Sequence, residues 1–557
     1  MSPNRIKAVA TTASRVQDIR VVLGEKTIRE SCSDYLTDEA RFGEGRAEQL
    51  YYARSESDVV AIVNRANETT TPITISAGRT GLTGGAVPQG GILLTLELMN
   101  QLSGFGYDEE KNKWYVRVQP GVTLEALNSA VRKKDLGALK GKITPKEQAA
   151  LNKFTNDPQT YFFPPDPTEM TAHMGGAVVA NASGARSFRY KAMRQWIRRI
   201  RVVLANGDIL DILRGTIFAE DDQFQIELTD GTVKEIKIPD YTMPKTKNAA
   251  GLYAHPGMDL IDLFIGSEGI LGIITETEVW LEKYPDRSLT IFAFFPSEEA
   301  AINFVEDIRS TTSPVKPTLV EYFDSNAVQM LREARAKGMG GVTVPTQVDQ
   351  CQAIIFFEIL FSEAEMEPTF MAAQEILGKH GIGMEGTWAG IEAGDLDKMK
   401  AVRHLIPETV NALIAQRKQT YPRVHKLGTD MAVPDEHLET IIKYYKALLD
   451  QAGMEYIIFG HIGDNHLHVN ILPRTDEEVD QGMHIYQQFA RKAVDLGGTV
   501  SAEHGIGKLK RSFLRVMYGD SGLEDMAKVK QVLDPEWILN PGNMIPKPGE
   551  VLESFET

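Results

Sequence analysis

One short run of alternating residues most strongly limits how this chain can fold. His466, His468 and Asn470 alternate with apolar residues near the end of the segment 458–470. In a β-strand, residues two apart project from the same face, so two imidazoles and one amide would leave the strand together. Such a strand either lines a polar site or faces water as a solvated edge strand.

A second short segment favours the polar site. The segment 501–508 carries Glu503 and His504, and His461 stands in the first segment. The two segments together hold four of the eleven histidines in the 557-residue chain. Imidazole and carboxylate groups are the usual ligands of a catalytic divalent metal, and such a site can keep one position open for substrate.

Size and composition predict a soluble protein of two or more domains. The hydrophobic fraction of 42% and the charged fraction of 24% are typical of globular proteins. A net charge of −16 argues against nucleic acid or an anionic membrane as the main partner. A local arginine cluster is interpreted as a solvated or phosphate-facing patch; its members are Arg194, Arg198, Arg199 and Arg201.

The two cysteines, Cys32 and Cys351, are too few and too far apart for a disulfide framework or a cysteine-ligated iron–sulfur cluster. The N-terminal residues lack the apolar core of a secretory signal. No apolar run approaches the roughly twenty residues that span a bilayer. We therefore expect a cytoplasmic location, with at most peripheral attachment to a membrane.

The first half of the chain contains three glycine-rich segments, at 76–85, 175–184 and 266–272. Glycine permits positive φ and close backbone approach, so consecutive amide N–H groups can point at one anion. Three such loops fit a diphosphate held by the backbone. None has the GxGxxG context of the nicotinamide fold, and there is no Walker lysine motif.

Local patterns predict an α+β organisation. Residues 1–50 are expected to form a helical arm, Ser57 to cap a helix, and 72–76 to form a strand; 135–160 are expected to be a surface insertion. From residue 287 strands and helices alternate, which predicts a cap of the ferredoxin-like kind. The expected pairs are the strand 289–295 with a helix opened by Ser297, the strand 353–359 with the helix 362–380, and the helix 435–452 with the strand that holds His461.

From about residue 35 to 547 the chain resembles flavin-binding enzymes of vanillyl-alcohol-oxidase type, and within them the D-lactate, glycolate and D-2-hydroxyglutarate dehydrogenases. The resemblance rests on six ordered motifs: 76–85, 164–168, 181–184, 247–248 with 266–272, both histidine segments, and 540–542. It implies a two-subdomain FAD-binding domain at 51–285, a cap or substrate domain with a metal site at 286–535, and a C-terminal return to the FAD domain at 536–557.

The resemblance also implies which residues contact FAD. The first and second loops would hold the diphosphate, and 165–168 would line the adenine side. The first loop lacks the histidine or cysteine that tethers flavin in some relatives, so we expect the FAD to be non-covalent. The expected contacts are Ser76, Ala77, Gly78, Arg79, Thr80, Gly81, Leu82, Thr83, Pro165, Asp166, Thr168, Gly175, Gly176, Asn181, Ser183, Gly184, Gly272, Ile274 and Asn540.

Carried over by position, His461, His468 and Glu503 match the metal ligands of the family, and His504 matches its catalytic histidine. Zinc, manganese and ferrous iron all suit such ligands. A 2-hydroxy acid can chelate a metal, which lowers the pKa of its hydroxyl group. A nearby imidazole can then take the proton while a hydride passes to the flavin. Asn470 matches a substrate-side residue.

The chain departs from the family at one position. The family reads Gly-Asp-Gly-Asn where this chain has Gly463-Asp464-Asn465-His466. His466 could therefore be a fourth ligand or bind substrate, and we favour a role beside the ligands. Arg403 matches the substrate arginine of the family, with a solvated helix arginine as the alternative. Lys426 lies near the family's substrate lysine, although its spacing to Asp430 is two residues longer.

These residues predict an FAD-dependent D-2-hydroxy-acid dehydrogenase acting on D-lactate, glycolate or D-2-hydroxyglutarate. One alternative is a flavoenzyme like the ether-lipid synthases, whose consecutive histidines are absent here. Another is a non-catalytic flavin subunit of a glycolate-oxidase-like complex, which would lack both metal segments. Electrons would leave to a separate quinone, cytochrome, electron-transfer flavoprotein or iron–sulfur subunit, and a homodimer is among the assemblies that the sequence allows.

Overall fold

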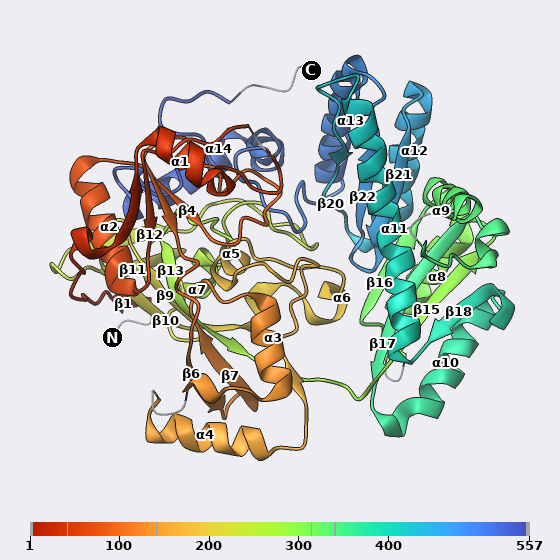
Figure 1. The fold of residues 1–557 in the computed structure, drawn as a ribbon, viewed down its shortest axis with the longest axis horizontal. Coiled ribbons are helices and arrows are strands. Elements are labelled where there is room, and N and C mark those ends of the chain that lie inside the picture. Colours follow the sequence, from red (N-terminus) through yellow and green to blue (C-terminus); the bar gives the residue numbers. More distant parts are fainter. Residues whose placement is uncertain (1–3, 42, 140–142, 313–314, 339–340, 553–557) are drawn as a thin grey trace.

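The computed structural model describes residues 4–41, 43–139, 143–312, 315–338 and 341–552. Figure 1 shows two lobes side by side. The first lobe runs from β1 (Arg5–Lys7) to β13 (Ile273–Trp280), and the second from β15 (Arg287–Phe295) to α13 (Asp476–Asp495). After them α14 (Arg511–Leu533) returns to the first lobe. No helix among the described residues is both long and apolar enough to cross a bilayer.

The first lobe contains a four-stranded sheet in the order β2-β3-β5-β4. Its strands are β2 (Arg20–Leu23), β3 (Gln49–Tyr52), β4 (Ile73–Ser76) and β5 (Ile92–Thr95). The strand predicted at 72–76 is thus confirmed. The predicted helical arm at 1–50 is wrong, because β1, β2 and part of β3 lie in it beside the short helix α1 (Glu25–Ser31).

The helix α2 (Glu56–Thr69) packs against this sheet through buried Val59, Ile62 and Val63. Its N-cap is Ser55, not the predicted Ser57, which lies in the first turn. Ser55 has an extended backbone, so its hydroxyl oxygen can accept the N–H of Asp58 at 3.2 Å.

A second sheet of the first lobe has the order β10-β9-β13-β7-β6. Besides β13 its strands are β6 (Leu102–Asp108), β7 (Lys113–Val118), β9 (Ile197–Val203) and β10 (Ile209–Leu213). A third sheet joins β1 to β11 (Gln223–Glu227) and β12 (Val233–Lys237). The helices of this part are α3 (Leu124–Lys133), α4 (Pro145–Asn156), α5 (Met174–Val179), α6 (Ser187–Tyr190) and α7 (Ile261–Phe264). Two short strands, β8 (Tyr161–Phe162) and β14 (Glu282–Lys283), pair with each other.

The expected surface insertion at 135–160 contains the capped helix α4, and the ring centroid of its buried Phe154 lies 4.8 Å from that of Phe105. One expectation for this lobe needs correction. The arginine cluster is neither solvated nor facing phosphate, because each of its members forms an ion pair with a carboxylate. Arg201, for example, lies 2.8 Å from Glu56, and Arg194 lies 3.1 Å from Asp262.

The second lobe is built on a sheet in the order β18-β15-β17-β16-β21-β22-β19, with β20 also paired to β22. Its other strands are β16 (Leu319–Phe323), β17 (Ala353–Phe361), β18 (Thr387–Gly390), β19 (Leu427–Gly428), β20 (Met431–Ala432), β21 (Tyr456–His461) and β22 (His466–Ile471). Its helices are α8 (Glu298–Arg309), α9 (Ser325–Lys337), α10 (Met366–Lys379), α11 (Ala393–Lys418), α12 (Leu438–Ala452) and α13.

The three predicted strand–helix pairs of the second lobe are confirmed. They are β15 with α8, which Ser297 caps, β17 with α10, and α12 with β21. The end of the chain returns to the first lobe, where Leu539 forms a parallel bridge with Ile73. Residues 553–557 of the predicted C-terminal return lie outside the described residues.

Candidate active site

A tight hairpin presents the first set of site residues. β21 ends at His461, a turn over 462–464 follows, and β22 begins at His466. His461 pairs directly with His466, and His468 pairs with Phe459. The strand predicted for the alternating run is therefore confirmed. It is an inner strand with His466 and Asn470 buried, so the solvated edge-strand alternative is wrong.

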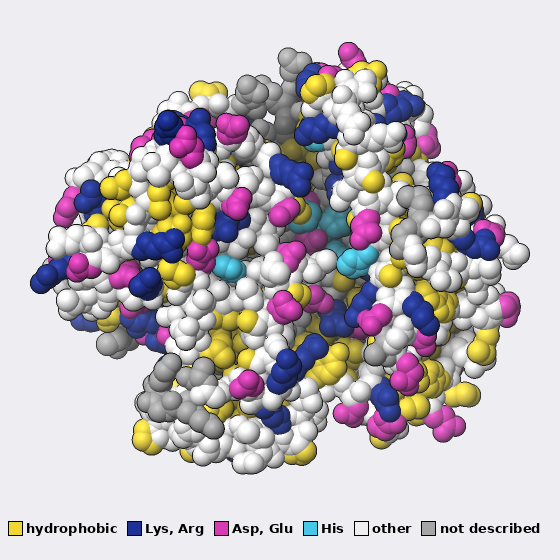
Figure 2. All heavy atoms as spheres, viewed as in Figure 1, with side chains coloured by type: hydrophobic (Ala, Val, Ile, Leu, Met, Phe, Trp, Pro, Cys, Tyr) yellow, Lys and Arg dark blue, Asp and Glu magenta, His cyan; other side chains and the backbone are white. Residues whose placement is uncertain are grey.

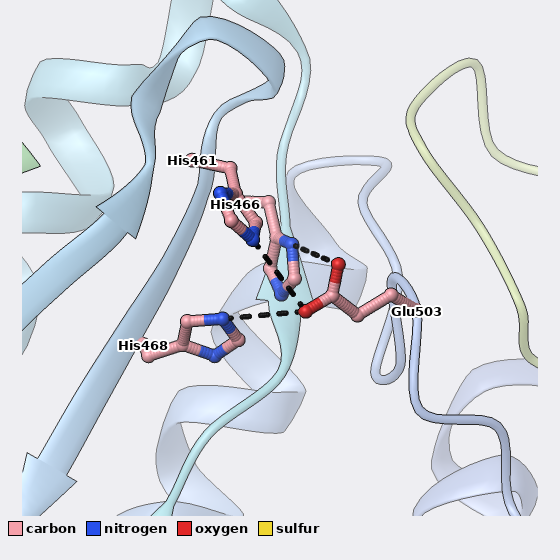
Figure 3. A group of neighbouring side chains, drawn as sticks. All are labelled: His461, His466, His468 and Glu503. Carbon is pink, nitrogen blue, oxygen red and sulfur yellow. Dashed lines mark ion pairs between the residues drawn. The ribbon is translucent and has the colours of Figure 1, made fainter. Parts of the chain in front are cut away.

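Three imidazoles of this hairpin and Glu503 point toward one another (Figure 3). Nε2 of His461 lies 3.6 Å and Nε2 of His468 lies 3.4 Å from Oε1 of Glu503. Nδ1 of His466 lies 3.7 Å from Oε2 of the same carboxylate. One donor atom from each of the four residues fits within 4.8 Å of the others. The structure thus brings together the three predicted metal ligands and adds His466 to them.

In His461 and His468, the ring nitrogen that faces away from Glu503 lies close to an oxygen atom. Nδ1 of His468 donates to the carbonyl of Thr429 at 3.0 Å, and Nδ1 of His461 lies 3.1 Å from Glu321. Outer acceptors of this kind orient metal-ligating histidines. Among the described residues, Nδ1 of His466, which faces Glu503, is buried without a well-formed hydrogen bond. Because buried polar atoms normally have partners, these residues fit a divalent metal held between them.

Asp430 organises the other side of the cluster. It is fully buried, and its carboxylate accepts the backbone N–H groups of Glu503 at 3.2 Å and His504 at 3.1 Å. It also lies 2.8 Å from Nζ of Lys510. Burial disfavours its charge, but His504, Lys510 and His466 outweigh that effect and hold its pKa well below the usual range. The carboxylate therefore fixes the loop that carries Glu503 and His504.

His504 lies beside the cluster and is more open than the other three histidines. A quarter of its side chain is exposed, and its ring stacks on that of His468 with centroids 5.5 Å apart. Nε2 lies 3.5 Å from Glu503, and Nδ1 lies 3.4 Å from Asp430. Burial lowers the pKa of His504 to about 4, so the ring is neutral at neutral pH and can accept a proton.

The three predicted substrate residues have different surroundings. The Arg403 guanidinium pairs with Glu321 through two nitrogens, with Nη2 2.6 Å from Oε1, so it is not the solvated helix arginine of the alternative. Nδ2 of Asn470 donates to the carbonyl of His468 at 3.0 Å. Lys426 is exposed. Arg403 thus contacts the outer acceptor of His461, which the sequence analysis did not anticipate.

The sequence analysis missed the roles of Asp430, Glu321 and Lys247. Nζ of Lys247 lies 2.7 Å from Oε2 of Glu503, and both side chains are nearly buried. Each of the three residues stands alone in the sequence without a distinctive spacing. Lys247 and Asp430 fall within or beside motifs of the resemblance, which was the one signal available for them.

The first FAD loop follows β4 and offers an array of amide groups. Among the described residues, no acceptor is found for the backbone N–H groups from Gly78 to Thr83. Arg79 adopts the left-handed conformation, with φ of 58°. Consecutive amide groups without acceptors form a concave site for an anion, so this loop fits a diphosphate.

The second loop packs against the turn at 165–168. A Cβ at Gly184 would lie 1.8 Å from the carbonyl oxygen of Asp166, so only glycine allows the two segments to touch. Thr168 and Asn181 have positive φ, and the buried hydroxyl of Ser183 has no partner among the described residues. Gly175 and Gly176 lie in the first turn of α5. These features fit a bound polar cofactor.

The remaining FAD candidates lie in and under the third loop. A Cβ at Gly272 would lie 2.4 Å from Val202, and Ile274 is buried in β13, so both residues belong to the packing of the sheet. Asn540 accepts the N–H of Ile75 at 2.7 Å and donates to the carbonyl of Glu268 at 2.8 Å. Asn540 thus joins β4, which leads into the first loop, to the third loop.

The loop that carries His504 is also attached to the FAD loops. Glu268 accepts the N–H groups of Ile506 at 2.6 Å and Gly507 at 2.7 Å. Nζ of Lys508 lies 3.2 Å from the carbonyl oxygens of Gly84 and Gly85. Figure 2 shows histidine and acidic side chains inside the hollow between the lobes. The catalytic candidates and the FAD loops therefore meet in one place.

Comparison with known proteins agrees with this arrangement. Residues 47–139 and 148–213 match the FAD binding domain family, and residues 284–544 match the C-terminal domain of FAD linked oxidases. D-lactate dehydrogenase of Anaerostipes hadrus is 28% identical over 94% of each chain. The glycolate oxidase subunit GlcD of Bacillus subtilis is 27% identical over 89% of this chain and 88% of its own. D-2-hydroxyglutarate dehydrogenase of Stutzerimonas stutzeri is 25% identical over 89% and 90%.

Solved structures show the same fold. 4-Ethylphenol oxidase from Gulosibacter chungangensis is 17% identical, with a TM-score of 0.61 over 95% of this chain and 94% of its own. An alkyldihydroxyacetonephosphate synthase is 16% identical, with a TM-score of 0.57 over 96% and 89%. The predicted α+β fold and the predicted cofactor FAD are confirmed. The chain therefore has the fold of vanillyl-alcohol-oxidase type and contains an FAD binding domain followed by a C-terminal domain of FAD linked oxidases.

Proposed function

We propose that the protein is a metal-assisted, FAD-dependent dehydrogenase that oxidises a D-2-hydroxy acid to the 2-oxo acid. One observation carries the proposal: the imidazoles of His461 and His468 converge on Glu503, directly beside the neutral imidazole of His504. The names of the relatives in the comparison, which act on D-lactate and D-2-hydroxyglutarate, support this substrate class. D-lactate is the substrate that we expect first.

His461, His468 and Glu503 would hold the metal, and the loops around Gly78 and Gly184 would hold FAD without a covalent bond. When bound, the metal lowers the pKa of the substrate hydroxyl, and FAD accepts the hydride from the α-carbon. Nε2 of His504 faces the cluster and takes the hydroxyl proton. Asp430 lies 3.4 Å from Nδ1 of His504, so it orients the ring and stabilises the charge that the proton brings.

Binding of the substrate carboxylate would fall to the cations at the rim of the cluster. Nη1 of Arg403 lies outside the pair with Glu321, 3.4 Å from Nε2 of His404, and Lys426 is exposed. A buried substrate carboxylate needs such a partner, because an unpaired charge is costly to desolvate. Electrons would then pass to a separate acceptor, because the chain's two cysteines cannot ligate an iron–sulfur cluster.

Anaerobic reduction of the bound flavin by a panel of D- and L-2-hydroxy acids tests the proposal. We expect bleaching by D-enantiomers, loss of bleaching after chelation with FAD retained, and recovery with Zn²⁺ or Mn²⁺. His504→Ala should slow flavin reduction by roughly 10²–10⁴-fold, the range of a general base. Full reduction by metal-free protein would refute the metal role, and no reduction by any hydroxy acid would favour the ether-lipid-synthase-like or non-catalytic alternatives.

A further inference from the structure

The position of His466 changes the composition of the metal site. We propose that Nδ1 of His466 is a fourth protein ligand, so that the ion is held by three imidazoles and one carboxylate. The inference rests on the proposed function, because it concerns the same ion. It differs from the set of two histidines and one glutamate that the family resemblance implies, and from the supporting role that the sequence favoured.

The backbone directs His466 inward. Asn465, the residue before it, has φ of 53°, and its side chain points away from the cluster. Nδ2 of Asn465 donates to Asp435 at 2.6 Å, and its Oδ1 accepts from Arg309, which also binds the carbonyl of Ile462. With the turn held in this way, β22 starts with His466 directly opposite His461.

The ring of His466 has two distinct sides. It is fully buried, and Nε2 lies 2.9 Å from Oδ1 of Asp430. A carboxylate beside Nε2 favours the tautomer that carries the proton there, which leaves a lone pair on Nδ1. Nδ1 faces Glu503 at 3.7 Å, and the ring centroid lies 4.5 Å from that of His468. The lone pair therefore points into the cluster.

A supporting role would require Nδ1 to form a hydrogen bond to one of the ligands. The distance of 3.7 Å to Oε2 of Glu503 is too long, and that oxygen already lies 2.7 Å from Nζ of Lys247. Nδ1 of His466 has no partner among the described residues, and it is fully buried. An unpartnered buried acceptor is unfavourable, whereas an ion in the cluster would satisfy it together with the two other imidazoles.

The additional imidazole has a chemical consequence. Neutral nitrogen donors favour Co²⁺, Ni²⁺ and Zn²⁺ over Mn²⁺, which prefers oxygen ligands. Four protein ligands also fill a tetrahedral ion, so a chelating substrate requires an ion that accepts five or six ligands. The site should therefore prefer Co²⁺ or Ni²⁺ to Mn²⁺ more strongly than a site with two histidines.

The test compares four FAD-loaded proteins stripped of metal and reloaded with Co²⁺: the wild type, His466→Asn, His468→Asn and the control His484→Asn. His484 is exposed on α13, away from the cluster. X-ray absorption spectroscopy should detect three imidazoles coordinated to Co²⁺ in the wild type and the control, and two in each of the other variants. The ratio of Mn²⁺ to Co²⁺ dissociation constants should fall about 10-fold or more in His466→Asn.

Two imidazoles in both the wild type and His466→Asn, with unchanged dissociation constants, would overturn the fourth ligand and leave the proposed function intact. Failure of the wild type to bind Co²⁺, Zn²⁺ or Mn²⁺ would instead remove the metal from the proposed function. Retained FAD and an unchanged far-UV spectrum show that each variant is folded. If His466→Asn does not fold, the imidazole count in the wild type alone decides, because two imidazoles there exclude a third ligand.

Discussion

The two halves of the candidate active site are built from different chemical groups. The FAD loops offer backbone N–H groups, as between Gly78 and Thr83, and require side chains mainly to be absent. The candidate metal cluster is made of side chains, and each of them is held by a further side chain or carbonyl, such as Asp430 or Glu321. A backbone site depends on conformation, whereas a side-chain site depends on a buried network of charges.

This difference predicts which substitutions each half tolerates. In the FAD loops many side chains can change as long as glycine remains where another backbone approaches, as at Gly184. In the cluster a single substitution leaves several buried groups without partners, because the carboxylate of Glu503 lies within 4 Å of all three hairpin histidines. Substitutions in the cluster should therefore reduce activity more than substitutions in the FAD loops, and they should leave FAD bound.

The largest effect is expected from Glu503→Gln. The variant removes the anionic ligand, and flavin reduction should fall about 10³-fold or more, because a metal contributes several kcal/mol and each 1.36 kcal/mol is tenfold. FAD content should stay unchanged. Rapid-mixing kinetics, elemental analysis and flavin absorbance measure the three quantities, with the exposed Glu524→Gln as the control. Loss of FAD together with metal would break the comparison between the halves.

Arg403→Ala should have the next largest effect. In the wild type, burial raises the pKa of Glu321, but Arg403 and His461 outweigh burial and hold that pKa low. The variant leaves this carboxylate, whose side chain is only 3% exposed, without its cation. Breaking such a pair costs about 2–5 kcal/mol of unfolding free energy, and both substrate and metal should bind more weakly. Denaturant titration measures the loss of unfolding free energy, and dissociation constants measure the weaker binding of metal and substrate.

The double variant Arg403→Ala/Glu321→Gln should recover much of the lost stability, since no buried charge remains unpaired. It should not recover substrate affinity if Arg403 also binds the substrate carboxylate. A substrate defect alone, with stability and metal affinity unchanged, would show that the pair with Glu321 does not support the cluster.

In the FAD half, Asn540→Ala should act more mildly and on the cofactor alone. It leaves the N–H of Ile75 and the carbonyl of Glu268 without their partner, at about 1–3 kcal/mol. The dissociation constant of FAD should therefore rise about 10–100-fold, as measured by flavin release on dilution, while metal content stays constant. Asn67→Ala on the exposed face of α2 is the matched control. A change in metal affinity would indicate that the halves are not separable.

The smallest expected effect concerns Asp324, a fully buried carboxylate one residue after β16. Burial raises its pKa to about 6. The folded state then binds a proton more tightly than the unfolded state, so this group favours folding at acidic pH. That contribution is fully present below about pH 4 and is lost as the pH rises through about 6.

Asp324→Asn keeps the cap of α9 without the charge, so the unfolding free energy of the variant should exceed that of the wild type by about 1–3 kcal/mol at pH 7.5 and by roughly half as much at pH 5. Denaturant titration at the two pH values measures the gain. An equal difference at both would show that Asp324 is ionised without penalty, unlike a buried carboxylate with weak partners.

The sequence predicted the parts of this site that leave a local pattern. Glycine runs indicate the FAD loops, and alternation of His466, His468 and Asn470 indicates the strand. Partners remote in the chain leave no such pattern, because Arg403 and Glu321 are 82 residues apart and Lys247 and Glu503 are 256 apart. For the same reason the sequence analysis assigned His466 and Arg403 to the site but did not identify the carboxylates that they contact, which are Asp430 and Glu321.

The register of the β21–β22 hairpin limits how the ligand set of this site can change during evolution. His461 faces His466 because the turn between them has one particular length. A single inserted or deleted codon there would turn β22 over and present the apolar side chains of Leu467 and Val469 in place of the imidazoles. Substitutions such as those at Asn465 and His466 can alter the ligand set one residue at a time, whereas a length change would erase it in one step.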